Sequence, residues 1–132
     1  MSTALLFPGQ GSQYIGMGTK WIQKYPYAKE LFDRADTALG FSLSKLCFEG
    51  PDTELVKTEF TQPAILTTSV AMFEILRREK NINFSYVAGH SLGEYSALVC
   101  AGALNFEDAV RTVNLRGRLM QKAVPVGMGK MA

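Results

Sequence analysis

The chain has 132 residues, of which 47% are hydrophobic and 20% charged, and it carries a formal net charge of +2. This length suits one ordinary domain, and this composition is that of a globular protein rather than a disordered one. The small charge argues against nucleic acid as a partner, and no apolar run is long enough to span a membrane. Because the N-terminus lacks the basic and long apolar regions of a signal peptide, we expect a cytoplasmic protein.

The chain opens with a short apolar run, which predicts a buried strand over residues 4–7. Pro8-Gly9 ends this strand and begins a glycine-rich loop that continues through residue 18. Three helices are then predicted, at residues 27–39, 43–48 and 52–56. Gly40 follows the first of these helices, in the position that glycine favours after a helix C-terminus.

A long, largely buried helix is the clearest element of the sequence. It is predicted to open at residues 61–63, which places Pro63 in a first turn where proline is tolerated. The apolar side chains of Leu66, Val70 and Phe73 then follow helical spacing. The polar run at residues 77–81 ends the helix.

A Gly-x-Ser-x-Gly pentapeptide lies between a predicted strand (86–88) and a predicted helix (94–101). A strand, a sharp turn and a helix in this order are typical of a nucleophile elbow. Side chains at Gly89 or Gly93 would collide with neighbouring backbone in such a turn. Backbone N–H groups at the helix start can stabilise a developing oxyanion, so Ser91 is the candidate acyl-accepting nucleophile. In the alternative interpretation, this is an ordinary turn and Ser91 only caps the helix.

A last long helix is predicted over residues 106–122, with Asn105 as its N-cap. Residues 125–129 are interpreted as a linker, and residues 130–132 as the start of a further strand. The order of strand, helices, strand and helix predicts an α/β fold with a parallel sheet, although only two strands are clear.

A serine nucleophile needs a base, and His90 is the only histidine of the chain. Because adjacent side chains leave a strand in opposite directions, we expect His90 to be a hydrogen-bonded structural residue under the turn. The base is therefore expected to lie outside this chain. Cys47 and Cys100 are interpreted as small buried residues, since two distant cysteines suit neither a disulfide framework nor a zinc site.

The loop after the first strand is a candidate for the second half of an oxyanion hole. Gly9 and Gly11 flank Gln10 and let its backbone approach a ligand closely. The N–H of Leu92 would be the partner donor. A glycine-rich turn without a catalytic role remains the alternative.

Arg116 lies on the last helix, roughly 80° to one side of its apolar stripe. It is therefore expected to be partly buried, whereas Arg111 and Arg118 are expected to be solvated. A partly buried arginine usually has a carboxylate partner, which either a substrate or an internal salt bridge can supply. Leu115 and Leu119 also lie outside the stripe, so we expect this helix to contact protein on more than one side.

Four blocks of this chain resemble, in the same order, the malonyl-CoA:acyl carrier protein transacylases of bacterial-type fatty-acid synthesis. The blocks are Phe7-Pro8-Gly9-Gln10-Gly11-Ser12-Gln13, Thr61-Gln62-Pro63-Ala64, Gly89-His90-Ser91-Leu92-Gly93-Glu94-Tyr95-Ser96-Ala97-Leu98 and Arg116-Gly117-Arg118-Leu119-Met120-Gln121. Acyltransferase domains of polyketide synthases share most of these blocks and are a close alternative.

The resemblance implies a role for each candidate residue. The malonyl group becomes an ester on Ser91, and its free carboxylate pairs with Arg116. The N–H groups of Gln10 and Leu92 form the oxyanion hole. Residues that possibly line the site are Gln62 and His90. Malonyl-CoA is the implied donor, the phosphopantetheine thiol of acyl carrier protein is the implied acceptor, and no permanently bound cofactor or metal is expected.

The resemblance also implies that this chain is incomplete. Residues 1–126 correspond to the first segment of a large, hydrolase-like subdomain, and residues 127–132 to the start of the crossing into a ferredoxin-like subdomain. That small subdomain and the catalytic histidine are missing from the chain. We therefore expect these 132 residues alone to have no useful transacylase activity.

Two other classes of function remain open. A serine esterase would share the elbow but would use water as the acceptor, and it would not need Arg116. A non-catalytic piece would only bind a carrier protein or an assembly partner. The charges that could form a basic rim for such a partner, although they are more often a solvated face, are Arg77, Arg78, Lys80, Arg118 and Lys122.

Overall fold

The computed structural model describes residues 1–125 and 127–129, which form an α/β structure with a short parallel sheet. Strands β1 (Ala4–Phe7) and β2 (Tyr86–Gly89) pair in parallel, with Ala4 opposite Tyr86 and Phe7 opposite Gly89. Both strands lie where the sequence predicts them. The strand predicted at residues 130–132 lies outside the described residues.

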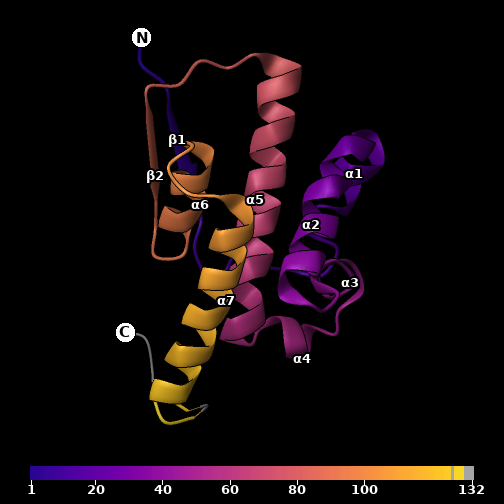
Figure 1. The fold of residues 1–132 in the computed structure, drawn as a ribbon, viewed down its shortest axis with the longest axis vertical. Helices are drawn as coiled ribbons and strands as arrows, with labels where there is room; N and C mark the ends of the chain where they lie inside the picture. The colour runs from indigo at the N-terminus through magenta and orange to yellow at the C-terminus, as the bar shows by residue number, and fades with distance from the viewer. Residues whose placement is uncertain (126, 130–132) are drawn as a thin grey trace.

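Helices make up most of the rest of the described chain (Figure 1). Before the long central helix they are α1 (Thr19–Lys24), the short 3₁₀ helix η1 (Pro26–Ala28), α2 (Lys29–Leu39), α3 (Leu43–Glu49) and α4 (Asp52–Leu55). The later helices are α5 (Thr58–Lys80), α6 (Gly93–Cys100) and α7 (Phe106–Ala123). Helix α1 is not predicted by the sequence, which was assigned no element between the glycine-rich loop, ending at residue 18, and the helix at residues 27–39.

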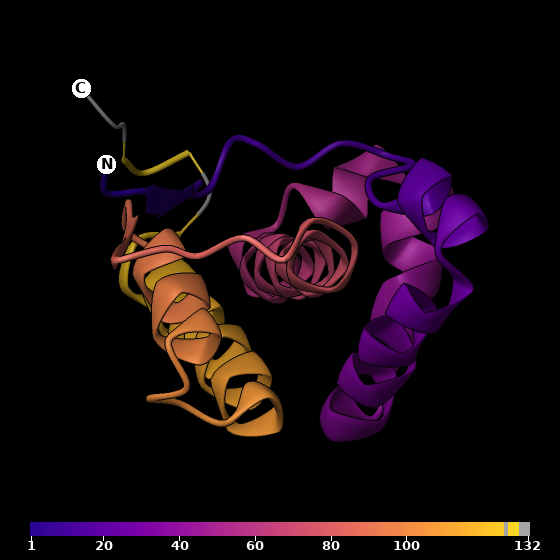
Figure 2. The same cartoon turned by 90° about the horizontal axis from the view of Figure 1, so that it is seen from above.

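Helix α5 is the centre of the structure. Figure 2 shows it nearly end-on, with α6 and α7 on one side, α2 on the other, and the chain after β1 passing over it toward α1. Its residues 61–67 are all buried. Side chains of α5 and of the helices around it form the buried core. The large ones are Phe32, Leu43, Leu55, Ile65, Leu66, Val110 and Val113.

Helix α5 begins at Thr58, three residues before the predicted start, so Pro63 lies inside the helix. Proline has no N–H, and the carbonyl of Glu59 therefore loses its helical partner. The side chain of Asn114 on α7 replaces that partner, because its Nδ2 donates to the Glu59 carbonyl at 2.8 Å. This contact ties α7 to the first turns of α5 and removes the cost of an unpaired carbonyl.

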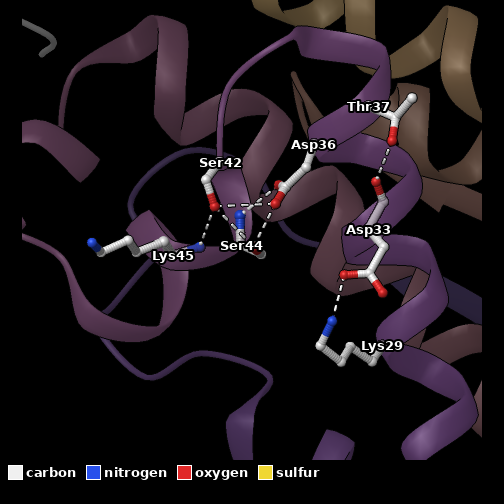
Figure 3. Close-up of polar contacts among 7 residues, drawn as sticks. All are labelled: Lys29, Asp33, Asp36, Thr37, Ser42, Ser44 and Lys45. Atoms are coloured by element: carbon white, nitrogen blue, oxygen red, sulfur yellow. Dashed lines mark hydrogen bonds and ion pairs between the residues drawn. The ribbon is translucent and has the colours of Figure 1, made fainter.

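The turn between α2 and α3 is closed by one carboxylate (Figure 3). Asp36 accepts hydrogen bonds from the backbone N–H and the hydroxyl of Ser44, and from the hydroxyl of Ser42. Ser42 is itself the N-cap of α3 and accepts from the N–H of Lys45. The chain can reverse here because Gly40 adopts the left-handed conformation expected after a helix, with φ 76°.

Two expectations about burial are wrong. The first strand was predicted to be buried, but Leu6 is 78% exposed, since the described sheet has no third strand beside β1 or packed over it. The side of α7 that carries Leu115 and Leu119 was expected to contact protein, but both side chains are exposed in the described structure, because α2, α5 and α6 pack on other sides of the helix.

The two cysteines are free in the structure, with Cys47 buried and Cys100 half-buried. Burial raises the pKa of each thiol to about 12, so both remain protonated and are poor nucleophiles. The expectation of two buried cysteines therefore holds for Cys47 and only in part for Cys100. Among the described helices, none combines the length and the apolar composition that crossing a bilayer requires.

Candidate active site

Ser91 lies in a strained turn between β2 and α6. Its φ is +51°, a left-handed conformation that is rare for residues other than glycine, asparagine and aspartate. A Cβ at Gly89 would overlap the backbone of Gly93, and a Cβ at Gly93 would overlap the carbonyl of Phe7 and come within 2.8 Å of that of Pro8. The prediction that the two glycines are required by close backbone contacts is therefore confirmed.

Three side chains from different elements meet at this turn. The exposed hydroxyl of Ser91 accepts a hydrogen bond from Nη2 of Arg116 on α7, at 3.2 Å. Nη1 of the same guanidinium donates to Oε1 of Gln62 on α5, at 2.8 Å. The structure thus brings together three residues that are far apart in the sequence and were each singled out from it.

The amide of Gln62 is fully buried and its orientation is fixed from two sides. Oε1 accepts from Arg116, while Nε2 donates to the thioether sulfur of Met120 at 3.3 Å. The reversed amide would place its NH₂ donors against those of the guanidinium, which has no acceptor. Gln62 therefore holds Arg116 from the buried side of the site.

The positive charge of Arg116 has no carboxylate partner among the described residues. Arg34, Arg77, Arg78 and Arg111 each form an ion pair with a glutamate or aspartate, but Arg116 does not. Its guanidinium carbon instead lies 5.6 Å from the centre of the Tyr95 ring. Of the two alternatives for Arg116, an internal salt bridge is thus absent from the described part of the chain.

Two backbone donors near Ser91 have no acceptor within residues 1–125 and 127–129. They are the N–H groups of Gln10, in the loop after β1, and of Leu92, at the N-cap of α6, and the N–H of Ser91 itself likewise has none. The loop is held close to the turn, because the N–H of His90 donates to the carbonyl of Phe7 at 3.2 Å. The side chain of Gln10 is turned away to Thr58 Oγ1, at 3.1 Å.

His90 is placed differently from the prediction. Its ring is exposed and makes no side-chain hydrogen bond with another described residue, whereas a hydrogen-bonded histidine under the turn was expected. The backbone of Gly9 lies against it, and a side chain at that glycine would come within 3.1 Å of His90 Nδ1. Because Gly9 has no side chain that could cover the His90 ring, the imidazole stays open to solvent.

Comparison with known proteins decides the family. Residues 4–132 match the acyl transferase domain. The chain belongs to this acyl transferase domain family. It is 57% identical over 129 residues to a malonyl CoA-acyl carrier protein transacylase of Bacillus subtilis, and 52% identical to one of Escherichia coli. Each alignment covers 98% of this chain but only 40% and 42% of the relative, so the chain spans less than half the length of these proteins.

Solved structures of this acyl transferase family have the same fold. The malonyl CoA-acyl carrier protein transacylase of Coxiella burnetii matches 96% of the chain with a TM-score of 0.93 and 50% identity. A malonyl-transacylase solved in complex with a type II PKS acyl-carrier protein matches 95% of the chain with a TM-score of 0.91 and 48% identity. In both cases the match covers 40% of the other chain, so the present structure is a partial domain of that fold.

An apolar cavity lies elsewhere in this acyl transferase chain. It measures about 490 Å³ and lies between β1, α1 and α5, with Phe7, Trp21, Ile65 and Met72 among its lining residues. Neither Ser91 nor Arg116 lines it. The polar site therefore depends on the turn, α5 and α7, and not on this cavity.

Sequence reasoning missed two contacts of the site. Met120 is 44% exposed and contacts Gln62, a role that was not expected from the sequence. Tyr95 was quoted only as part of a block. Each lies four residues after a site residue, Met120 after Arg116 and Tyr95 after Ser91, and this one-turn spacing is the signal that could have identified them.

The possible basic rim is not one surface. Figure 1 shows the C-terminal ends of α5 and α7 at opposite ends of the molecule, and these ends carry Arg77, Arg78 and Lys80 on one side and Arg118 and Lys122 on the other. Arg77 and Arg78 are also paired with Glu74, whose pKa is lowered chiefly by the hydrogen bond from Arg77.

Proposed function

We propose that this chain is the nucleophile-bearing part of a malonyl-CoA:acyl carrier protein transacylase. Ser91 takes the malonyl group from malonyl-CoA as an ester and passes it to the phosphopantetheine thiol of acyl carrier protein. One observation carries the proposal: an exposed hydroxyl in a strained turn lies 3.2 Å from a cation that has no carboxylate partner among the described residues. No permanently bound cofactor is needed for this chemistry, and the expected cytoplasmic location remains a prediction.

The turn acts as a nucleophile elbow in this proposal. Ser91 Oγ attacks the thioester carbonyl carbon, the carbonyl oxygen becomes an oxyanion, and the C–S bond then breaks to release the CoA thiol. The N–H groups of Gln10 and Leu92 donate to the oxyanion, which is supported by their lack of an acceptor within the described chain. Attack of the carrier thiol on the ester repeats the sequence and frees Ser91.

The proton of Ser91 needs an acceptor that this site does not supply. Arg116 and Gln62 cannot take it, because the guanidinium has no lone pair to offer and an amide is a very weak base. His90 lies on the open side of the turn and is adjacent in sequence, so we assign it only a possible lining role. We therefore propose that the base lies outside residues 1–132, and that this chain alone does not turn over.

Arg116 selects the acyl group in this scheme. A malonyl group presents a free carboxylate, which a guanidinium binds through paired hydrogen bonds, whereas an acetyl group leaves the cation unpaired. Gln62 supports this role because it fixes one edge of the guanidinium from the core.

The same proposal divides the chain into two parts that belong to different subdomains. Residues 1–126 form the first segment of the large subdomain, and residues 127–132 begin the crossing to a small subdomain. The full reaction needs those further parts.

The proposal is tested with the chain combined with the remaining segment of its Bacillus subtilis relative, co-expressed as a separate polypeptide. The complex is incubated with equal amounts of malonyl-CoA and acetyl-CoA, and the mass of the peptide that contains Ser91 is measured. We expect a malonyl adduct in the wild-type chain and none in Ser91→Ala. In Arg116→Ala we expect about 10- to 100-fold less malonyl adduct relative to acetyl adduct. The substitution removes the hydrogen bonds to the malonyl carboxylate, and hydrogen bonding to a charged group contributes about 1.5–3 kcal/mol.

Arg111→Ala is the matched control, because Arg111 is an exposed arginine of the same helix that pairs with Asp108. Rapid release of free malonate, without transfer to acyl carrier protein, would indicate a serine esterase instead. Binding of carrier protein without any adduct on Ser91 would indicate a non-catalytic piece. Transfer only to a polyketide carrier would place the enzyme in polyketide synthesis.

A further inference from the structure

We propose that Tyr95 is a positioning residue whose ring fixes the plane of the Arg116 guanidinium for a substrate carboxylate. The inference rests on the proposed function of Arg116. It adds a residue that the sequence motif contains but to which neither the motif nor the comparisons give a role.

The ring and the guanidinium are close and the ring is well supported. The guanidinium carbon lies 5.6 Å from the ring centre, which is within the range of a cation–π contact. Tyr95 is half-buried on α6 and packs against the hydrophobic core. The core therefore holds the ring, and the ring limits the positions that the long Arg116 side chain can adopt.

The contact also leaves the N–H groups of Arg116 available. A guanidinium has five N–H donors, of which Ser91 and Gln62 use one each. An aromatic face orients the guanidinium without using any donor, so three remain. A carboxylate that binds through two of them needs a guanidinium whose plane is already set.

Comparison with the other arginine–aromatic contacts of the described chain points in the same direction. Arg34 lies over Phe106 and Arg78 lies over Tyr27, and each is also paired with a glutamate. Arg116 over Tyr95 lacks such a partner among the described residues. Arg116 is thus oriented by a ring and has no protein carboxylate beside it among the described residues, which suits a ligand that supplies a carboxylate.

The experiment uses the 132-residue chain labelled with ¹⁵N, and it follows the side-chain Nε–H resonances of its arginines. Arg116→Lys identifies the Arg116 resonance by its loss. We compare wild type, Tyr95→Phe and Tyr95→Leu, with Tyr27→Leu as the matched control at the other arginine–tyrosine contact. Each variant is then titrated with sodium malonate at constant ionic strength, and a thermal melt checks that it is folded.

We expect the ring current of Tyr95 to displace the Arg116 resonance in wild type and Tyr95→Phe, and the displacement to disappear in Tyr95→Leu. Tyr95→Leu should also bind malonate about three- to tenfold more weakly, while Tyr95→Phe restores the affinity. Tyr27→Leu should move the resonance of Arg78 and leave that of Arg116 unchanged. An Arg116 resonance that is the same in wild type and Tyr95→Leu would overturn the inference, whether or not malonate binds.

The same titration separates this inference from the proposed function. If malonate fails to move the wild-type Arg116 resonance, the substrate role of Arg116 is wrong, even if Tyr95 orients it. If malonate binds wild type and folded Tyr95→Leu equally, Arg116 keeps its role and the positioning role of Tyr95 is wrong.

Discussion

At the scale of single residues, the site is built on a conformational cost at Ser91. A left-handed backbone costs an L-residue about 1–2 kcal/mol, because Cβ approaches the following carbonyl oxygen. The surrounding contacts maintain it: the backbone of β1 packs on Gly93, and Gly89 packs on the start of α6. The result is a serine that is exposed at the turn, with its hydroxyl 3.2 Å from Nη2 of Arg116.

This strain predicts that the chain becomes more stable when Ser91 is replaced by a residue that adopts a positive φ without strain. Ser91→Gly should raise the free energy of unfolding by about 0.5–1 kcal/mol, since glycine adopts positive φ freely but loses more entropy on folding. Ser91→Ala keeps Cβ and should stay close to wild type, so it is the control. Urea denaturation followed by circular dichroism measures the difference. A Ser91→Gly chain that is less stable than Ser91→Ala by about 0.5–1 kcal/mol, the entropy cost of glycine alone, would show that φ +51° carries no strain.

At the scale of elements, the site depends on how α5 and α7 cross. Pro63 interrupts the hydrogen bonding of α5, and Asn114 of α7 supplies the missing donor to Glu59. One turn further along α5 is Gln62, which holds Arg116. Pro63 therefore has a second effect beside interrupting the backbone hydrogen bonds of α5. The Glu59 carbonyl that it leaves unpaired becomes a docking point for α7, the helix that carries Arg116.

A double-mutant cycle tests this docking point. Asn114→Ala should lower the free energy of unfolding by about 1–3 kcal/mol, because it leaves the part-buried Glu59 carbonyl unpaired. In the Pro63→Ala background, the backbone N–H of residue 63 can pair with that carbonyl, and the same substitution should cost less by about 1 kcal/mol or more. Strictly additive effects in thermal or chemical unfolding would contradict the account.

Helix boundaries show where the sequence was sufficient. Asn105 gives the start of α7 by its capping side chain, and the apolar runs of β1 and β2 locate both strands. The predicted start of α5 was wrong because Pro63 is typical of a first helical turn. Only Asn114, a donor 51 residues further along the chain, makes Pro63 acceptable inside the helix. Local sequence cannot show such a tertiary partner.

The candidate site likewise has some features that the sequence predicts and others that depend on tertiary contacts. The sequence singled out Ser91, Arg116 and Gln62, and the structure brings their side chains together, while their roles remain proposals. Sequence alone could not orient His90, because its burial depends on which segment covers the turn. It also could not show that Tyr95 lies on the guanidinium, since that contact depends on the crossing of α6 and α7.

At the scale of the whole molecule, two of the surfaces that expose apolar side chains are relevant to association. One is on the sheet, at Leu6 and Tyr86, and the other is on α7, at Leu115 and Leu119. The described sheet has two strands, without a third to protect its edges. Exposed apolar patches and open strand edges favour association with other chains.

We therefore expect the 132-residue chain to self-associate as its concentration rises, which sedimentation velocity measures. Leu6→Lys and Leu119→Lys should each reduce this association, because they place a charge on an exposed apolar surface. Val56→Lys, at an isolated exposed position after α4, is the control and should have no effect. A chain that stays monomeric at all concentrations would show that these surfaces do not attract one another.

The residue after Arg116 links the proposed carboxylate site to the spacing of two helices. Gly117 has no room for a side chain, since a Cβ there would come within 2.5 Å of the Thr58 carbonyl and 2.6 Å of Glu59 Cα. Any larger residue must push α7 away from α5, and Arg116 would then retreat from Gln62 and Ser91. If Arg116 has the role proposed above, a substitution at Gly117 changes acyl-group preference from the rear of α7, through distance alone and without contact to the ligand.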